Sequence, residues 1–167
     1  MYSDRLKELK GRLAALSGRQ AVKLRVQEGV LHAIFGRMTD AEGAFLTAIA
    51  QDPGLVSPYV NLANIRLLAN DGSAALQVVK QGLQKNPDSA LLNLLAARVY
   101  ADRNDAANAA AHFAKVISAA PELAARYPEL AEIGQPRTAS TGGGGGTEPQ
   151  RAAEAGEKPP VIWGTDR

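Results

Sequence analysis

Three prolines at a fixed spacing constrain the fold of this chain more than any other feature. Pro53, Pro87 and Pro121 follow one another at steps of 34 residues. Three alanines repeat at the same step: Ala41, Ala75 and Ala109. Each proline follows an alanine-rich, helix-forming stretch and prevents that helix from continuing. A period of this length is typical of stacked helical hairpins, which bury a continuous core only when several repeats pack together.

The period divides the central part of the chain into three rows, residues 22–55, 56–89 and 90–123. Each row contains a helical stretch, a turn rich in Gly, Asn and Asp, and a second helical stretch that ends before a proline. The turns contain side chains suited to cap the second helices: Thr39 or Asp40, Ser73 and Asp105. We therefore predict three helical hairpins joined by short turns.

Residues 1–21 are predicted to form a basic amphipathic helix before the first row. Leucines share one face of a helix over residues 5–16, which Gly18 is expected to end: Leu6, Leu9, Leu13 and Leu16. Residues 1–25 carry seven Lys or Arg against two acids, so the basic character of the chain is concentrated there. One interpretation is a helix packed on the first repeat, and the alternative is a seam that pairs two copies of the chain.

The chain after the third row is predicted to contain a short helix and a disordered tail. Residues 124–134 are expected to form a capping helix in which Tyr127, Leu130 and Ile133 cover the last repeat. Residues 135–167 include an unbroken glycine run and bury too little apolar surface to fold. The tail ends in an apolar motif with the only tryptophan, Trp163. This motif is either an unstructured terminus or a segment that docks on the protein itself.

The rows resemble tetratricopeptide repeats, most closely in residues 56–89. Small residues stand where the two helices of such a repeat approach each other: Gly29, Ala63 and Ala97, then Ala41, Ala75 and Ala109. A bulky residue follows four positions later: Phe45, Val79 and Phe113. The resemblance implies an all-α fold, a right-handed superhelical solenoid of three tetratricopeptide hairpins with terminal capping helices. It also implies a concave groove lined by the first helix of each hairpin.

The resemblance assigns a peptide groove to residues on these first helices: Lys23, Gln27, Val30, Ser57, Val60, Asn61, Asn64, Leu68, Leu91, Leu94 and Arg98. The same face includes Val26, Ile34, Leu95 and Asp102. Family members that bind the C-terminal carboxylate of heat-shock chaperones use Lys, Asn and Arg in these positions. This chain retains only Asn61, with valine or leucine elsewhere, so that ligand is excluded. The groove is expected to take an apolar peptide segment or an amphipathic helix.

The sequence does not favour an enzyme. The chain has no cysteine and only two histidines, His32 and His112, which lie in different rows. It contains no phosphate-binding loop, metal-ligand pattern or activated nucleophile. We therefore expect no cofactor, no metal and no small-molecule substrate.

The expected partner is a protein or a peptide. The basic N-terminal region has no interleaved aromatic residues, so neither nucleic acid nor a membrane is favoured. We predict a non-enzymatic interaction scaffold or adaptor. The alternative is a homo-oligomerisation module that pairs through the N-terminal leucine helix or the repeat ends. The chain shows neither a signal peptide nor an apolar run of membrane-spanning length, which predicts a cytoplasmic location.

Overall fold

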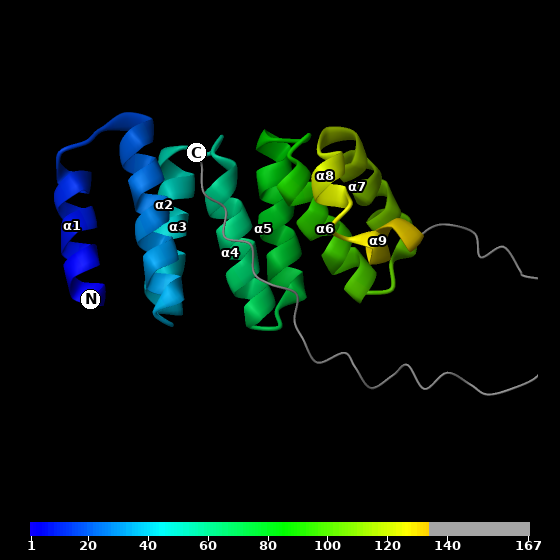
Figure 1. Ribbon diagram of the computed structural model, residues 1–167, viewed down its shortest axis with the longest axis horizontal. Helices are drawn as coiled ribbons and strands as arrows, with labels where there is room; N and C mark the ends of the chain where they lie inside the picture. Colours follow the sequence, from blue (N-terminus) through cyan, green and yellow to red (C-terminus); the bar gives the residue numbers. More distant parts are fainter. Residues whose placement is uncertain (134–167) are drawn as a thin grey trace, which may run out of the picture.

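The computed structural model describes residues 1–133, which fold into α-helices without strands in that range. The helices are α1 (Tyr2–Ala14), α2 (Gly18–Ile34), α3 (Met38–Gln51), α4 (Val56–Leu68), α5 (Gly72–Lys85), α6 (Ala90–Asp102), α7 (Ala106–Ala119), α8 (Pro121–Ala124) and α9 (Pro128–Glu132). Figure 1 shows α1 to α7 side by side in chain order, with α8 and α9 at the far end. The predicted all-α helical solenoid is confirmed. The tail predicted for residues 135–167 lies outside the described residues.

The helices α2 to α7 pack as three hairpins. Each hairpin is a pair of consecutive helices, α2 with α3, α4 with α5, and α6 with α7. Neighbouring hairpins contact each other through α3 with α4 and through α5 with α6. The first helices also contact one another in order, α2 with α4 and α4 with α6. The first helices therefore form one layer along the molecule.

The turn within each hairpin has the same backbone geometry in all three cases. Gly36, Asn70 and Asn104 stand 34 residues apart and adopt left-handed φ angles of 74°, 59° and 57°. The next backbone N–H donates to the carbonyl five residues earlier, at 2.9 Å each time: Arg37 to His32, Asp71 to Arg66 and Asp105 to Tyr100. This is the Schellman ending of a helix, which glycine and asparagine favour because they tolerate a left-handed backbone.

The second helices begin directly after these left-handed residues. Asp105 caps α7, as predicted, and accepts a hydrogen bond from the backbone N–H of Asn108 at 3.2 Å. The predicted cap Ser73 was wrong, because α5 is capped by Asp71, which accepts from the backbone N–H of Ala74 at 2.9 Å. The left-handed residue sets the start of the next helix, so the cap is the residue that follows it.

The same position in the first hairpin holds Arg37, and the predicted caps Thr39 and Asp40 were wrong. Helix α3 begins at Met38, so both residues already lie in its first turn. Arg37 has no side-chain oxygen to offer the helix. Its Nε instead donates to Oδ2 of Asp40 at 2.6 Å. The first hairpin thus has a surface ion pair where the other two hairpins have a side-chain helix cap.

Small residues hold the two helices of each hairpin close together. Gly29 of α2 faces the ring of Phe45 of α3, and a Cβ at position 29 would lie only 2.5 Å from a ring carbon. Phe45 itself is fully buried. The periodic alanines Ala41, Ala75 and Ala109 are buried in the same way. The close approach explains why these positions hold glycine or alanine.

The N-terminal helix differs from the prediction at its C-terminal end. Helix α1 ends at Ala14, so Leu16 lies outside it and is 40% exposed. Gly18 does not end this helix but begins α2, with a left-handed φ of 62°. The remaining leucines are partly buried, and α1 packs mainly against α2: Leu6, Leu9 and Leu13.

The other end of the solenoid is covered by α8 and α9. Helix α8 contacts α7, and α9 contacts both α6 and α7. Tyr127 and Leu130 are buried in a cluster with Leu94 and Phe113, and Ile133 packs against it. These side chains cover the apolar face that the third hairpin would otherwise expose.

Candidate protein-binding face

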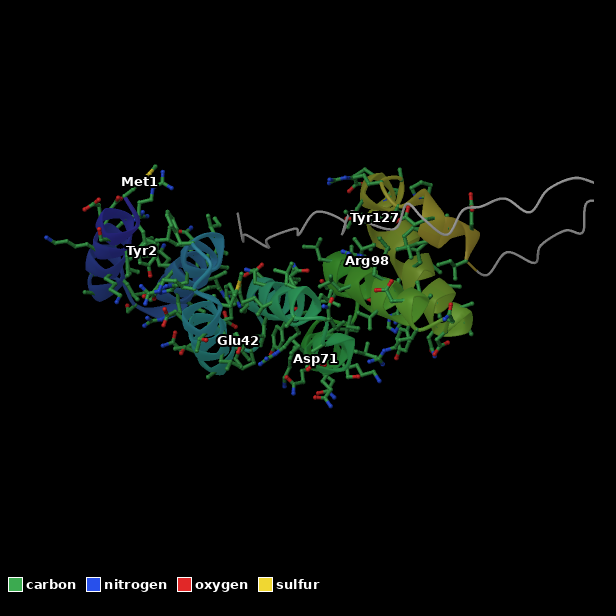
Figure 2. The ribbon with its side chains drawn as sticks, turned by 90° about the horizontal axis from the view of Figure 1, so that it is seen from below. Met1, Tyr2, Glu42, Asp71, Arg98 and Tyr127 are labelled. Atoms are coloured by element: carbon green, nitrogen blue, oxygen red, sulfur yellow. The ribbon has the colours of Figure 1, made fainter. Side chains whose placement is uncertain are left out.

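The helices form a curved array with a concave and a convex side. Figure 2 shows both ends of the array, marked by Tyr2 and Tyr127, raised on the same side of the molecule. Arg98 of α6 lies on this concave side, whereas Glu42 and Asp71 lie on the opposite, convex side. The concave side therefore belongs to the layer of first helices that contains α6.

The period identifies the residues that share the orientation of Arg98. Positions 34 residues earlier are Asn64 and Val30, on α4 and α2. These three residues form one set, with one residue from each hairpin. Helical residues three or four positions apart lie on one face, so three further sets share it. We define the concave face by these four sets: Lys23, Ser57 and Leu91; Gln27, Asn61 and Leu95; Val30, Asn64 and Arg98; Ile34, Leu68 and Asp102.

Five residues predicted for the groove are buried: Val60 and Leu94 in the hydrophobic core, and the polar side chains Ser57, Asn61 and Asn64. Val60 packs in a cluster with Tyr59 and Leu92, and Leu94 packs against the C-terminal helices. Val26 occupies the equivalent position of the first hairpin, and all three are 2% exposed. This position serves packing in every hairpin, so the candidate surface consists of the exposed and partly buried members of the four sets above.

On the concave face, buried polar side chains of α4 are surrounded by apolar and charged side chains. The centre is α4, where Ser57, Asn61 and Asn64 are buried. Around them, Gln27, Ile34 and Asp102 are exposed and Leu95 is buried. The other side chains of the concave face are partly buried: Lys23, Val30, Leu68, Leu91 and Arg98. An amide side chain both donates and accepts hydrogen bonds, as a peptide backbone does.

Two cations of the concave face have no acidic partner among residues 1–133. Arg25 is paired with Glu28 at 2.9 Å and Arg66 with Glu42 at 3.1 Å. Neither Lys23 nor Arg98 forms an ion pair within that range. A partly buried guanidinium without a carboxylate partner is suited to bind a carboxylate through two parallel hydrogen bonds.

The two histidines have structural contacts and lie in different hairpins. The Tyr2 hydroxyl lies 2.7 Å from Nδ1 of His32, which ties α1 to α2. His112 stacks on Tyr100 with ring centroids 5.6 Å apart, and its Nδ1 lies 2.9 Å from Oδ1 of Asn93. Burial lowers the pKa of His112, and the nearby cations Lys115 and Lys80 lower it further.

Neither a metal site nor a membrane-spanning helix is found in the part of the chain that the structure describes. No three His, Cys, Asp or Glu side chains within residues 1–133 are grouped so that they could hold a metal ion. No helix in this range combines the length and the apolar character needed to cross a bilayer. The chemistry available on the concave face is hydrogen bonding, apolar contact and pairing with anions.

Comparison with known proteins finds similarity to a tetratricopeptide repeat protein and to a solved structure. "Tetratricopeptide repeat protein 8" of Mus musculus is 30% identical over 93 residues, which are 56% of this chain and 18% of the relative. The chain therefore spans less than a fifth of that relative's length. The solved structure titled "Crystal structure of MamA" matches with a TM-score of 0.58 at 18% identity, covering 77% of this chain and 80% of that one. Such an identity supports the fold alone. No protein-family model matches the chain.

Proposed function

We propose that the chain is a non-enzymatic scaffold for protein–protein interaction, because its sequence and fold are similar to those of tetratricopeptide repeat proteins. Its concave face binds an apolar peptide segment or an amphipathic helix of a protein partner. The observation that carries this proposal is the composition of the face. Buried polar side chains of α4 are flanked by partly buried apolar side chains and by cations without an acidic partner among residues 1–133.

Each part of the face has a role in binding. The exposed amide of Gln27 offers a donor and an acceptor to a peptide backbone. Leu68 and Leu91 are partly exposed, and covering them removes further apolar surface from water, at about 25 cal/mol for each Å². Arg98 is available to an acidic group of the partner. A segment that must become ordered on binding would have a Kd of about 1 μM, or about −8 kcal/mol.

Two substitutions on the concave face and one matched control test the proposal. Leu68→Asp places a charge at a partly exposed apolar position at the end of α4, and Arg98→Glu reverses the charge of the cation. Leu46→Asp is the control, because Leu46 lies on α3 and is already 51% exposed. The full chain and its variants are immobilised, and proteins retained from a cell extract are quantified by mass spectrometry.

We expect one or more proteins to be retained by the unmodified chain and by the Leu46→Asp variant. Both concave-face variants should retain at least about tenfold less, which corresponds to about 1.4 kcal/mol. Circular dichroism confirms that each variant stays helical. Equal retention by all folded variants would contradict the assignment of binding to the concave face.

A further inference from the structure

Building on the proposed function, we infer that the concave face has a ligand within its own chain. The ligand is the apolar motif Val161, Ile162 and Trp163, which docks in cis between α2, α4 and α6. Residues 134–167 lie outside the described part of the structure. The inference therefore rests on the chemistry of that sequence, on the concave face and on the position at which the described chain ends.

The large apolar side chains of residues 134–167 are confined to the motif of Val161, Ile162 and Trp163. Residues 134–160 contain no leucine, isoleucine, valine, methionine or aromatic residue. Val161, Ile162 and Trp163 then follow directly after two prolines, Pro159 and Pro160. Proline restricts its own backbone and that of the preceding residue to extended conformations. The motif is thus presented on a stretch that favours an extended backbone.

The charges of the tail and the face are complementary at one point. Asp166 follows Trp163 by three residues, which is about 10 Å along an extended chain. Arg98 lies one helix away from the centre of the face and has no acidic partner within residues 1–133. Neighbouring packed helices are about 8–10 Å apart, so Asp166 could reach Arg98 while Trp163 contacts α4.

The linker has the length needed to bring the motif to the face. The described chain ends just after α9, which packs on α6 and α7. The 27 residues from 134 to 160 include the glycine run. A flexible linker of this length has a root-mean-square span of about 28 Å. Helix α4 is adjacent to α6, so the centre of the face falls within this distance.

The tether makes docking favourable even when the contact itself is weak. A short flexible linker gives an effective concentration of about 1 mM. A motif with a Kd of about 10 μM would then occupy the face in about 99 of 100 molecules. A protein partner would have to displace it, and would bind about 100-fold more tightly to a chain without the motif. The tail would thus set the threshold for partner binding.

The fluorescence of Trp163 tests docking directly, because the chain has no other tryptophan. In the full chain we expect emission shifted to shorter wavelength and protected from acrylamide, independently of protein concentration. Leu68→Asp and Arg98→Glu should restore water-like emission, and Leu46→Asp should leave the docked signal unchanged. Water-like emission in the unmodified chain would overturn the inference. A signal that grows with protein concentration would also overturn it, since the motif would then dock on a second copy.

A second measurement separates this inference from the proposed function. The full chain with Trp163→Ala is titrated with a labelled peptide of residues 158–167 and is also used in the capture experiment. We expect the peptide to bind, and expect capture of the protein partner to increase at least about tenfold over the unmodified chain. If the peptide does not bind but capture still depends on Leu68, self-docking is wrong and the scaffold proposal stands. If the peptide does not bind and capture does not depend on Leu68, both self-docking and the scaffold proposal are wrong.

Discussion

Gly29 is a position at which packing leaves no room for a side chain. A methyl group there would lie 2.5 Å from the buried ring of Phe45. Overpacking costs about 1–3 kcal/mol, while alanine gains about 1 kcal/mol of helix propensity over glycine. We expect Gly29→Ala to lower the free energy of unfolding by about 1 kcal/mol, measured by urea denaturation.

Gly43 provides the matched control for this change. It also lies within a helix, α3, but nothing stands within 4 Å of a Cβ at that position. Gly43→Ala should therefore raise the free energy of unfolding by about 0.5–1 kcal/mol. If both substitutions stabilised the protein equally, the close contact between Gly29 and Phe45 would be ruled out.

His112 gives the protein a predictable response to pH. Asn93 donates through its Nδ2 to the carbonyls of Pro87 and Ser89, which leaves its Oδ1 to accept from Nδ1–H of His112. The pKa of His112 is lowered by burial and by two cations, Lys115 of α7 and Lys80 of α5. The unfolded chain therefore binds this proton at higher pH than the folded chain. Folding stability should fall as the pH drops through about 6.5.

Urea denaturation at about pH 8 and about pH 5.5 measures this response. His112→Gln keeps a donor near Asn93 but cannot be protonated, so the variant should lose less stability between the two values. The two proteins differ only at position 112, so the difference between their losses reports on His112. An identical loss in both proteins would show that His112 is not the group responsible.

The period predicts residues that repeat, and fails where one repeat differs from the others. The buried positions Ala41, Ala75 and Ala109 are predictable because close packing demands a small residue in every hairpin. The cap of α3 was missed because Arg37 replaces the aspartate found at the equivalent positions 71 and 105. The packing role of Val60 was missed because the period alone does not distinguish a buried position from an exposed one beside it on the same helix. The neighbouring helix determines which of the two side chains is covered.

At the scale of the elements, α1 is the helix with the weakest attachment. None of its residues is fully buried, and it packs mainly against α2. Its attachment is concentrated at Tyr2, whose hydroxyl bonds His32 and whose ring lies 5.1 Å from that of Phe35. The guanidinium of Arg37 stacks over the same ring at 5.2 Å. The partly buried leucines of α1 favour packing on α2 over a seam between two copies.

Removing Tyr2 should therefore release α1 without unfolding the repeats. We expect Tyr2→Ala to increase amide hydrogen exchange across α1, since its anchoring contacts are lost, while α4 to α7 keep their protection. Lys7→Ala is the control, because Lys7 is exposed on the same helix. Unchanged exchange in α1 of the Tyr2→Ala variant would show that the leucine contacts alone hold this helix.

At the scale of the whole molecule, function depends on the side of the array that each helix presents. Stacking places α2, α4 and α6 on the concave side and leaves exposed residues of α3, such as Leu46, away from it. The sequence predicts the hairpins and their first helices from the period and the family resemblance. It does not predict that Arg98 lacks an acidic partner within residues 1–133 or that the polar side chains of α4 are buried, because both depend on contacts between different hairpins.

A photo-cross-linking amino acid placed at either of two exposed positions tests the central claim most directly. Position 27 lies on the concave face, and position 46 lies on α3 outside it. Each full-length variant is irradiated in living cells, and adducts are identified by mass spectrometry. We predict that position 27 cross-links to a protein partner or to the chain's own residues 158–167, while position 46 gives no specific adduct. Specific adducts at position 46 and none at position 27 would contradict the account.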